Sequence, residues 1–234
     1  MIRIIVPTGK SREEKFKKCH ESVPKKEEYL YFIDLQSVNG DNGFTKAVNE
    51  GVILDSGHEY IPDYIFLLND DTELFPDTID KAIEFMEAHP KCGIMGCQNL
   101  DMTNPDKIIW GGSGAPHPAG QHKIGQVSLG DLREPTKERW VTFSSAFIRR
   151  EVFETIGLLD EKMQWVYSDS DFCYRARYWG WECWYNPESK ILHEHNISRN
   201  PDKKRLMQFR LDKAAFEAKW MNGKAYFDLD SELL

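Results

Sequence analysis

The segment Tyr64-Ile65-Phe66-Leu67-Leu68-Asn69-Asp70-Asp71 joins five apolar residues directly to three polar ones. A short, unbroken apolar run that ends in turn-forming residues is typical of a strand covered on both faces. Such strands occur mainly in parallel sheets that lie between helices, so the segment favours an α/β fold. The polar end then lies at the carboxyl edge of the sheet, where open α/β folds bind their ligands.

Strand and helix patterns alternate on both sides of this segment, which predicts a mostly parallel sheet between helices. Further strands are predicted at residues 2–6, 29–33, 92–97, 140–148, 182–185 and 190–192. Helices are predicted after a capping box at Ser11-x-x-Glu14, from 44 to 51, after a cap at Asp77, from 151 to 156, from 169 or 170 to 179, and from 202 to 220. Residues 100–139 show no sustained period, which predicts a long irregular excursion.

The composition limits the function classes. The 234 residues are 41% hydrophobic and 29% charged, as in soluble globular chains. A net charge of −8 argues against a nucleic-acid partner. No apolar run approaches the ~20 residues of a membrane-spanning helix, and no secretory signal opens the chain, so we expect a cytoplasmic protein. The five cysteines include no Cys-x-x-Cys pair and are predicted to be buried thiols.

Three polar groups could carry chemistry. Asn69-Asp70-Asp71 could hold a divalent cation that bridges phosphates, although this composition is also that of an ordinary turn. Asp169 and Asp171 open a predicted helix, where capping and ion pairing are the alternative reading. His193 follows a short strand, and a satisfied core or surface histidine is its alternative. Three short basic runs could touch an anionic surface, although a solvated helix or loop face is favoured for each: Lys15-Phe16-Lys17-Lys18, Lys25-Lys26 and Lys203-Lys204-Arg205.

In order and spacing, these segments resemble the family 2 glycosyltransferases, inverting enzymes of the GT-A fold that use a nucleotide-activated sugar. The resemblance spans nearly all of residues 2–198 and rests on motifs that are weak singly and specific as a set. They are Val6-Pro7, Asn42-Gly43-Phe44, Asn49-Glu50-Gly51, Leu68-Asn69-Asp70-Asp71, Ile156-Gly157-Leu158-Leu159-Asp160-Glu161, Ser168-Asp169-Ser170-Asp171 and Ile191-Leu192-His193.

The resemblance implies one α/β domain of the GT-A type over residues 1–234, with a central, mostly parallel sheet flanked by helices. Residues 1–100 would bind the nucleotide sugar, 101–200 would form the acceptor and catalytic half, and 201–234 a C-terminal helix and tail. The donor would be a UDP-, dTDP- or GDP-sugar, and the acceptor a glycan or lipid-linked glycan, with peripheral membrane contact.

The resemblance also implies roles for single residues. Asn69-Asp70-Asp71 stands at the Asp-x-Asp motif, so Asp71 would contact Mn²⁺ or Mg²⁺ and Asp70 the ribose or sugar side. His193 matches a histidine that completes the metal site in some members. Asp169 stands at the general base. The residues implied in nucleotide binding are Val6, Pro7 and Thr8 with Asp34 at the base pocket, Asn42 and Gly43 around the nucleotide, and Asn69.

Ser168 takes the place of the family's usual glutamate, so the role of base could pass to Asp171. Residues two apart point about 200° apart around a helix, so at most one of Asp169 and Asp171 can face an acceptor. Asp171 lies four residues before Arg175, a spacing that suits an ion pair. This favours Asp169 as the base and Asp171 as a structural partner.

Two other functions remain open at this point. A sugar nucleotidyltransferase shares the architecture but needs a glycine-rich, basic loop after the first strand, of which residues 7–12 are a poor version. A non-catalytic carbohydrate- or nucleotide-binding module would explain Ser168. Trp110, Trp140 and Trp165 could stack on an acceptor sugar, with core packing as the alternative.

Overall fold

The computed structural model describes residues 1–24, 33–39, 43–53, 61–113, 133–194 and 203–221. Within these residues, nine strands form one sheet. In chain order they are β1 (Ile2–Thr8), β2 (Ile33–Asn39), β3 (Tyr64–Leu68), β4 (Thr72–Leu74), β5 (Cys92–Asp101), β6 (Asn104–Trp110), β7 (Thr136–Glu138), β8 (Ser145–Arg149) and β9 (Glu182–His193).

The sheet has the strand order β2-β1-β3-β8-β5-β9-β4, with β6 paired to β5 and β7 to β9. β1 pairs in parallel with β2 and β3, and β5 pairs in parallel with β9. β8 runs antiparallel to both β3 and β5, and β4 runs antiparallel to β9. Five of the seven strands on this path therefore point the same way, and the predicted mostly parallel sheet is confirmed.

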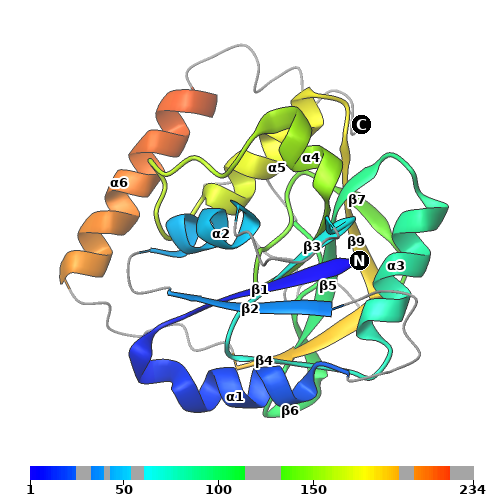
Figure 1. Ribbon diagram of the computed structural model, residues 1–234. Coiled ribbons are helices and arrows are strands. Elements are labelled where there is room, and N and C mark those ends of the chain that lie inside the picture. The colour runs from blue at the N-terminus through cyan, green and yellow to red at the C-terminus, as the bar shows by residue number, and fades with distance from the viewer. Residues whose placement is uncertain (25–32, 40–42, 54–60, 114–132, 195–202, 222–234) are drawn as a thin grey trace.

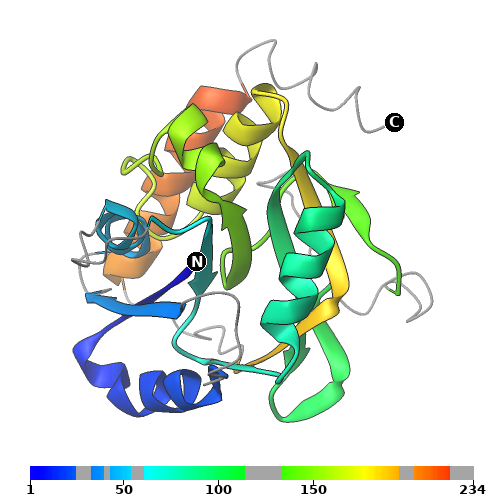
Figure 2. The ribbon, with the colours of Figure 1, turned by 45° about the vertical axis from the view of Figure 1, so that its right-hand side comes forward.

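Helices cover both faces of the sheet (Figures 1 and 2). One face carries α2 (Phe44–Ile53), α4 (Arg150–Ile156), α5 (Ser168–Tyr178) and α6 (Lys203–Trp220), and the other carries α1 (Glu13–Ser22) and α3 (Thr78–Ala88). A short 3₁₀ turn, η1 (Lys10–Arg12), joins β1 to α1. No helix in the described ranges is long and apolar enough to cross a membrane.

Strand β3 shows why the sheet needs two helical layers. Ile65 and Leu67 pack in the core beneath α2, α4 and α5, whereas Phe66 and Leu68 pack in the core beneath α1 and α3. Because successive side chains of a strand point to opposite faces, an apolar run is stable only when both faces are covered. Gly51 allows α2 to lie close to β1, since a Cβ there would meet Cγ2 of Ile5 at 2.6 Å.

The beginning of the chain differs from the prediction at two places. β2 runs from Ile33 to Asn39, beyond the end of the strand predicted at 29–33, and residues 29–32 lie outside the described residues. Ser11 does not cap a helix, because it lies inside η1, and α1 begins at Glu13 without a side-chain cap. Arg12, at the junction, points instead to acidic groups after β3.

Residues 100–139 are more regular than expected, because β5 extends to Asp101 and turns back through β6, and β7 joins the sheet edge. The short strands predicted at 182–185 and 190–192 form one strand, β9, with an irregularity in register. Asn186 lies opposite Cys97 and Lys190 opposite Gln98, so Pro187 falls within the irregular part. Proline lacks an N–H donor and is tolerated in sheets at such irregularities.

Candidate active site

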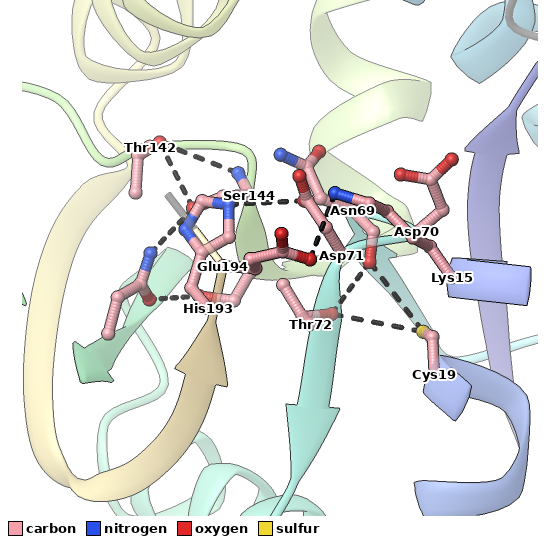
Figure 3. A network of polar contacts seen from close by, with 12 residues as sticks. Lys15, Cys19, Asn69, Asp70, Asp71, Thr72, Thr142, Ser144, His193 and Glu194 are labelled. Atoms are coloured by element: carbon pink, nitrogen blue, oxygen red, sulfur yellow. Dashed lines mark hydrogen bonds and ion pairs between the residues drawn. The ribbon is translucent and has the colours of Figure 1, made fainter. Parts of the chain in front are cut away.

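The topology brings the carboxyl ends of distant strands together at one edge of the sheet. Asn69-Asp70-Asp71 follows β3, and His193 is the last residue of β9. Thr72, at the start of β4, pairs with His193, and the N–H of Glu194 donates to the carbonyl of Asp71 at 2.9 Å. Figure 3 shows Asp71 and His193 side by side as a result.

A cavity of about 580 Å³ opens at this edge. Its walls come from the ends of β1, β3 and β9, from the segment before β8, and from the beginnings of α5 and α6. The residues that line it include Pro7, Arg12, Asn69, Asp70, Asp71, Trp140, Ser144, Trp165, Ser168, Asp169, His193 and Arg205. Segments separated by more than a hundred residues thus share one polar pocket.

Arg12 is the main counter-ion of the acidic pair. Its Nε lies 2.7 Å from Oδ2 and 2.8 Å from Oδ1 of Asp70, and its Nη2 lies 2.8 Å from Oδ2 of Asp71. Thr8 Oγ1 donates a further hydrogen bond to Asp70 Oδ2 at 2.9 Å. The bonds to Asp70 outweigh partial burial and raise the pKa of Arg12, so the guanidinium stays charged. Both carboxylate oxygens of Asp70 therefore accept hydrogen bonds from protein side chains.

Asp71 stands between Arg12 and His193. His193 Nε2 lies 3.2 Å from Asp71 Oδ1. Burial by itself would raise the pKa of Asp71, but His193 and then Arg12 outweigh it and hold that pKa at about 2. The carboxylate is therefore ionised over the whole neutral range and available to a cation.

The pair Asp71 and His193 fits a divalent cation. Asp71 Oδ1 is buried without a hydrogen-bond partner in the described part of the chain, and it faces His193 Nε2 at 3.2 Å. Adjacent ligand atoms around an octahedral cation with bonds of about 2.1 Å lie about 3 Å apart. Carboxylates suit Mg²⁺ and Mn²⁺, and imidazole suits first-row metals. Among the described residues no three His, Cys, Asp or Glu side chains form a metal cluster.

Asp169 and Asp171 have opposite environments, although they lie on the same first turn of α5. Asp169 lines the cavity, and its Oδ1 accepts the N–H of Ser170 at 2.8 Å. Asp171 is fully buried, where its Oδ2 accepts from Arg175 Nε at 2.9 Å and its Oδ1 from Trp220 Nε1 at 2.8 Å. Lys219 Nζ also lies 2.8 Å from Oδ1 of Asp171. Only Asp169 is placed to meet a substrate.

Ser168 and two of the three tryptophans considered for sugar stacking line the cavity. Ser168 is buried and opens α5 in the cavity wall, so the position of the family's glutamate carries a small, neutral side chain. Trp110 is packed in the core, which excludes sugar stacking. Trp140 is 1% exposed yet lines the cavity, whereas Trp165 lines it and is 39% exposed.

The residues expected around the nucleotide do not all reach the cavity. Pro7 and Asn69 line the cavity. Thr8 does not line it but donates a hydrogen bond to Asp70, which does, and the side chain of Val6 lies in the core. The expectation for Asp34 is wrong, because Asp34 pairs with Arg3 near the beginning of β2, far from the carboxyl edge where Thr8 pairs with Asn39. Asn42 lies outside the described residues, and Gly43 has a φ of 111° beside Gln164.

Sequence reasoning missed Asp212, which shapes the cavity from α6. Asp212 is fully buried, and its carboxylate accepts the N–H groups of Gln164, Trp165 and Val166 at 2.8–3.0 Å. The signal in the sequence is its spacing, since an acid four residues before Phe216 and eight before Trp220 lies on the apolar face of its helix. Arg12 was missed because its partners lie 58 and 59 residues away.

Known proteins share this architecture. No protein-family model matches the sequence. The chain is 26% identical over 166 residues to the O-antigen biosynthesis protein RfbC of Myxococcus xanthus, covering 68% of this chain and 13% of that protein. It is 24% identical over 189 residues to the N-acetylglucosaminyl-diphospho-decaprenol L-rhamnosyltransferase of Mycobacterium tuberculosis, covering 72% of this chain and 62% of that protein. The chain thus spans less than two thirds of either relative.

Solved structures agree on the fold. The structure of GalNAc-T7 with UDP, GalNAc and Mn²⁺ superposes with a TM-score of 0.66 at 14% identity, over 99% of this chain and 53% of that one. The mannosyltransferase PcManGT from Pyrobaculum calidifontis, in complex with GDP-Man and Mn²⁺, superposes with a TM-score of 0.56 at 14% identity, over 99% of this chain and 69% of that one.

The sheet, the acidic pair at its carboxyl edge and these likenesses define a protein of the GT-A fold. Within that fold, the chain is similar in sequence to an O-antigen biosynthesis protein and to an L-rhamnosyltransferase.

Proposed function

We propose that this chain transfers a sugar from a nucleoside-diphosphate donor to an acceptor hydroxyl, with inversion at the anomeric carbon and the assistance of Mn²⁺ or Mg²⁺. The observation that carries the proposal is that Asp71, His193 and Asp169 line one cavity. The first two suit a cation that meets a diphosphate, and the third suits a base that meets a hydroxyl. The donor and the acceptor can therefore meet between them.

The donor end of the cavity is built for a diphosphate. Arg12 lines it and supplies positive charge beside Asp70 and Asp71. When bound at Asp71 and His193, the divalent cation would neutralise charge on the departing nucleoside diphosphate. Pro7 and Thr8, at the end of β1, stand next to this region and support the nucleotide. Charged groups fixed before the reaction need little reorganisation when the leaving group departs.

At the other end, Asp169 accepts the proton of the acceptor hydroxyl. The hydroxyl oxygen forms a bond to the anomeric carbon on the face opposite the nucleotide, and the bond to the diphosphate oxygen breaks with its electron pair. Asp169 is the second residue of α5, where the partial positive charge of the helix N-terminus favours the ionised carboxylate. An ionised carboxylate is ready to act as a general base. Trp165 offers a half-exposed ring in the same wall for an acceptor sugar.

A donor panel tests the proposal directly. Thermal unfolding is followed with UDP-, dTDP- and GDP-sugars, each with Mn²⁺, with Mg²⁺ and with a chelator. A ligand at about 100 times its dissociation constant stabilises a fold by about 2.7 kcal/mol, so one donor with one metal should raise Tm clearly. That donor should then be hydrolysed slowly to the nucleoside diphosphate and the free sugar. Consumption of a nucleoside triphosphate with release of diphosphate would instead indicate a sugar nucleotidyltransferase.

A further inference from the structure

Helix α6 has two apolar faces, and only one of them is packed. Phe216 and Trp220 are buried against α5 and its neighbours. On the opposite side Leu206, Met207 and Leu211 are 43%, 55% and 49% exposed. Figure 1 shows α6 on the outside of the helical layer. An apolar face turned outward on a surface helix marks an interaction site when its residues are contiguous.

The exposed apolar residues are interleaved with cations. At 100° per residue, Lys203, Lys204 and Arg210 fall within the same sector of about 160° as Leu206, Met207 and Leu211. We call these six residues the basic–apolar face. No ion pair to another described residue is recorded for its three cations. The face therefore offers positive charge and apolar side chains together.

The net charge of α6 has the opposite sign to that of the whole chain. Residues 203–220 hold six Lys or Arg and two Asp or Glu, which gives +4, within a chain of net charge −8. The half that carries the basic–apolar face, residues 203–211, has four cations and no acid. A second copy of α6 would bring like charge against like charge. An anionic lipid surface complements both the charge and the apolar side chains.

The basic–apolar face and the cavity lie on opposite sides of the first turns of α6. Arg205 lines the cavity and lies 5.8 Å from the ring of Trp165, another wall residue. At 100° per residue, Arg205 projects about 180° from the centre of the basic–apolar face. A surface that meets this face would therefore contact α6 on the side away from the cavity.

We propose that the basic–apolar face docks the protein on anionic phospholipid headgroups. The proposal does not rest on the proposed function, because it needs only α6. Electrostatic attraction to the headgroups also makes docking sensitive to salt.

Vesicle co-sedimentation of the full chain, without donor or metal, tests the docking. The vesicles are phosphatidylcholine alone or phosphatidylcholine mixed with phosphatidylglycerol. We expect binding to the mixed vesicles only, with weakening as salt rises. The variants K203E/K204E/R210E and L206S/M207S/L211S should each lose at least tenfold in affinity. The matched control K17E/K18E/K46E makes the same charge change at other exposed positions and should bind as the wild type does.

Three results would overturn the docking: no binding of the wild type to mixed vesicles, unchanged binding of both face variants, or an equal loss in the control. Circular dichroism checks folding, and the single variant R210E replaces any triple variant that unfolds. Light scattering checks self-association, and a dimer abolished by L206S/M207S/L211S without vesicle binding would assign the face to a second copy. Donor hydrolysis in solution is measured separately, so loss of docking and loss of catalysis are distinguishable.

Discussion

Asp169 and Asp171 separate two roles that the sequence places on one helical turn. Asp169 faces the cavity, whereas Asp171 joins α5 to α6 through Trp220 and Lys219. Asp169→Asn keeps the shape but removes proton acceptance, so sugar transfer should fall by about 10²- to 10⁴-fold with donor affinity little changed. Steady-state kinetics with a confirmed acceptor, together with donor titration, measures both.

Asp171→Asn is the matched variant for that experiment. Asp171 sits in a buried charge cluster rather than in a helix cap, so its loss should cost about 3 kcal/mol of folding stability. A cap alone would cost only about 0.5–2 kcal/mol. Urea unfolding distinguishes the two values. If Asp171→Asn is stable but inactive while Asp169→Asn transfers sugar normally, the proposed roles are reversed.

The environment of Asp71 makes stability depend on acid pH. The pKa of Asp71 is about 2 in the fold against 3.8 for an ordinary aspartate, so the ionised form stabilises the fold above about pH 4. This contribution, about 2 kcal/mol, should be lost as the pH falls from about 5 to 2. Asp71→Asn cannot titrate, so its unfolding free energy should fall less steeply over that range. Parallel curves for the two proteins would contradict the assignment.

Arg12 occupies the position beside Asp70 and Asp71 that an added cation would share. Removing its charge in Arg12→Ala should raise the affinity for Mn²⁺ in the absence of donor by about tenfold, because two carboxylates lose their counter-ion. Arg12→Lys keeps the charge and should stay close to wild type. Calorimetric titration with Mn²⁺ measures the difference. A weaker Mn²⁺ affinity in Arg12→Ala would mean that Arg12 positions the carboxylates rather than competing for them.

At the scale of elements, α6 controls a wall of the cavity through Asp212. Both carboxylate oxygens accept backbone N–H groups from residues 164–166, so an amide at this position would turn donors toward donors. We expect Asp212→Asn to cost about 3 kcal/mol, because buried N–H groups lose their acceptor. The KM for the acceptor should rise with it, since Trp165 and Val166 line the cavity.

Lys213→Ala is the control for that experiment on the same helix. Among the described residues, Lys213 pairs only with the exposed Glu217 at 3.2 Å, a contact worth about 0.3–0.5 kcal/mol. Urea unfolding gives the loss of stability for both variants, and steady-state kinetics gives the change in KM. If Asp212→Asn left both the free energy of unfolding and the KM unchanged, the wall at residues 164–166 would be held by α2 instead. The Thr45 N–H of α2 donates to the Gln164 carbonyl at 3.1 Å.

Elements with a strong local pattern could be predicted from the sequence, and those fixed by distant partners could not. The apolar run of β3 and the periodic apolar face of α3 are visible in the local sequence, and both elements are found where expected. The extent of β2 and the continuity of β9 depend on the partner strands, which the local sequence does not record. The same limit holds in the site. His193 could be named from its motif, but Arg12 and Asp212 act through contacts 46 to 59 residues away.

Across the whole molecule, the cysteines follow the prediction of buried thiols, since all five are free and buried. Burial raises the pKa of Cys19 and of Cys97 to about 12 and also raises those of Cys92 and Cys173. Because the thiolate is the reactive form, the native protein should react with Ellman's reagent far more slowly than the unfolded chain. Absorbance in buffer and in guanidinium chloride measures this. Rapid native labelling of one thiol would show that its region opens.

The place of β9 has a consequence for how this chain is made. Although β9 ends at residue 193, it inserts between β5 and β4, which are synthesised long before it. Until the ribosome has released residues 182–193, β5 has an unpaired edge on the side that β9 will occupy, and His193 cannot approach Asp71. Exposed edges recruit other chains, and contacts of long sequence separation form slowly. The nascent protein therefore passes through a stage that depends on protection from aggregation, and the pair of Asp71 and His193 forms only when that stage ends.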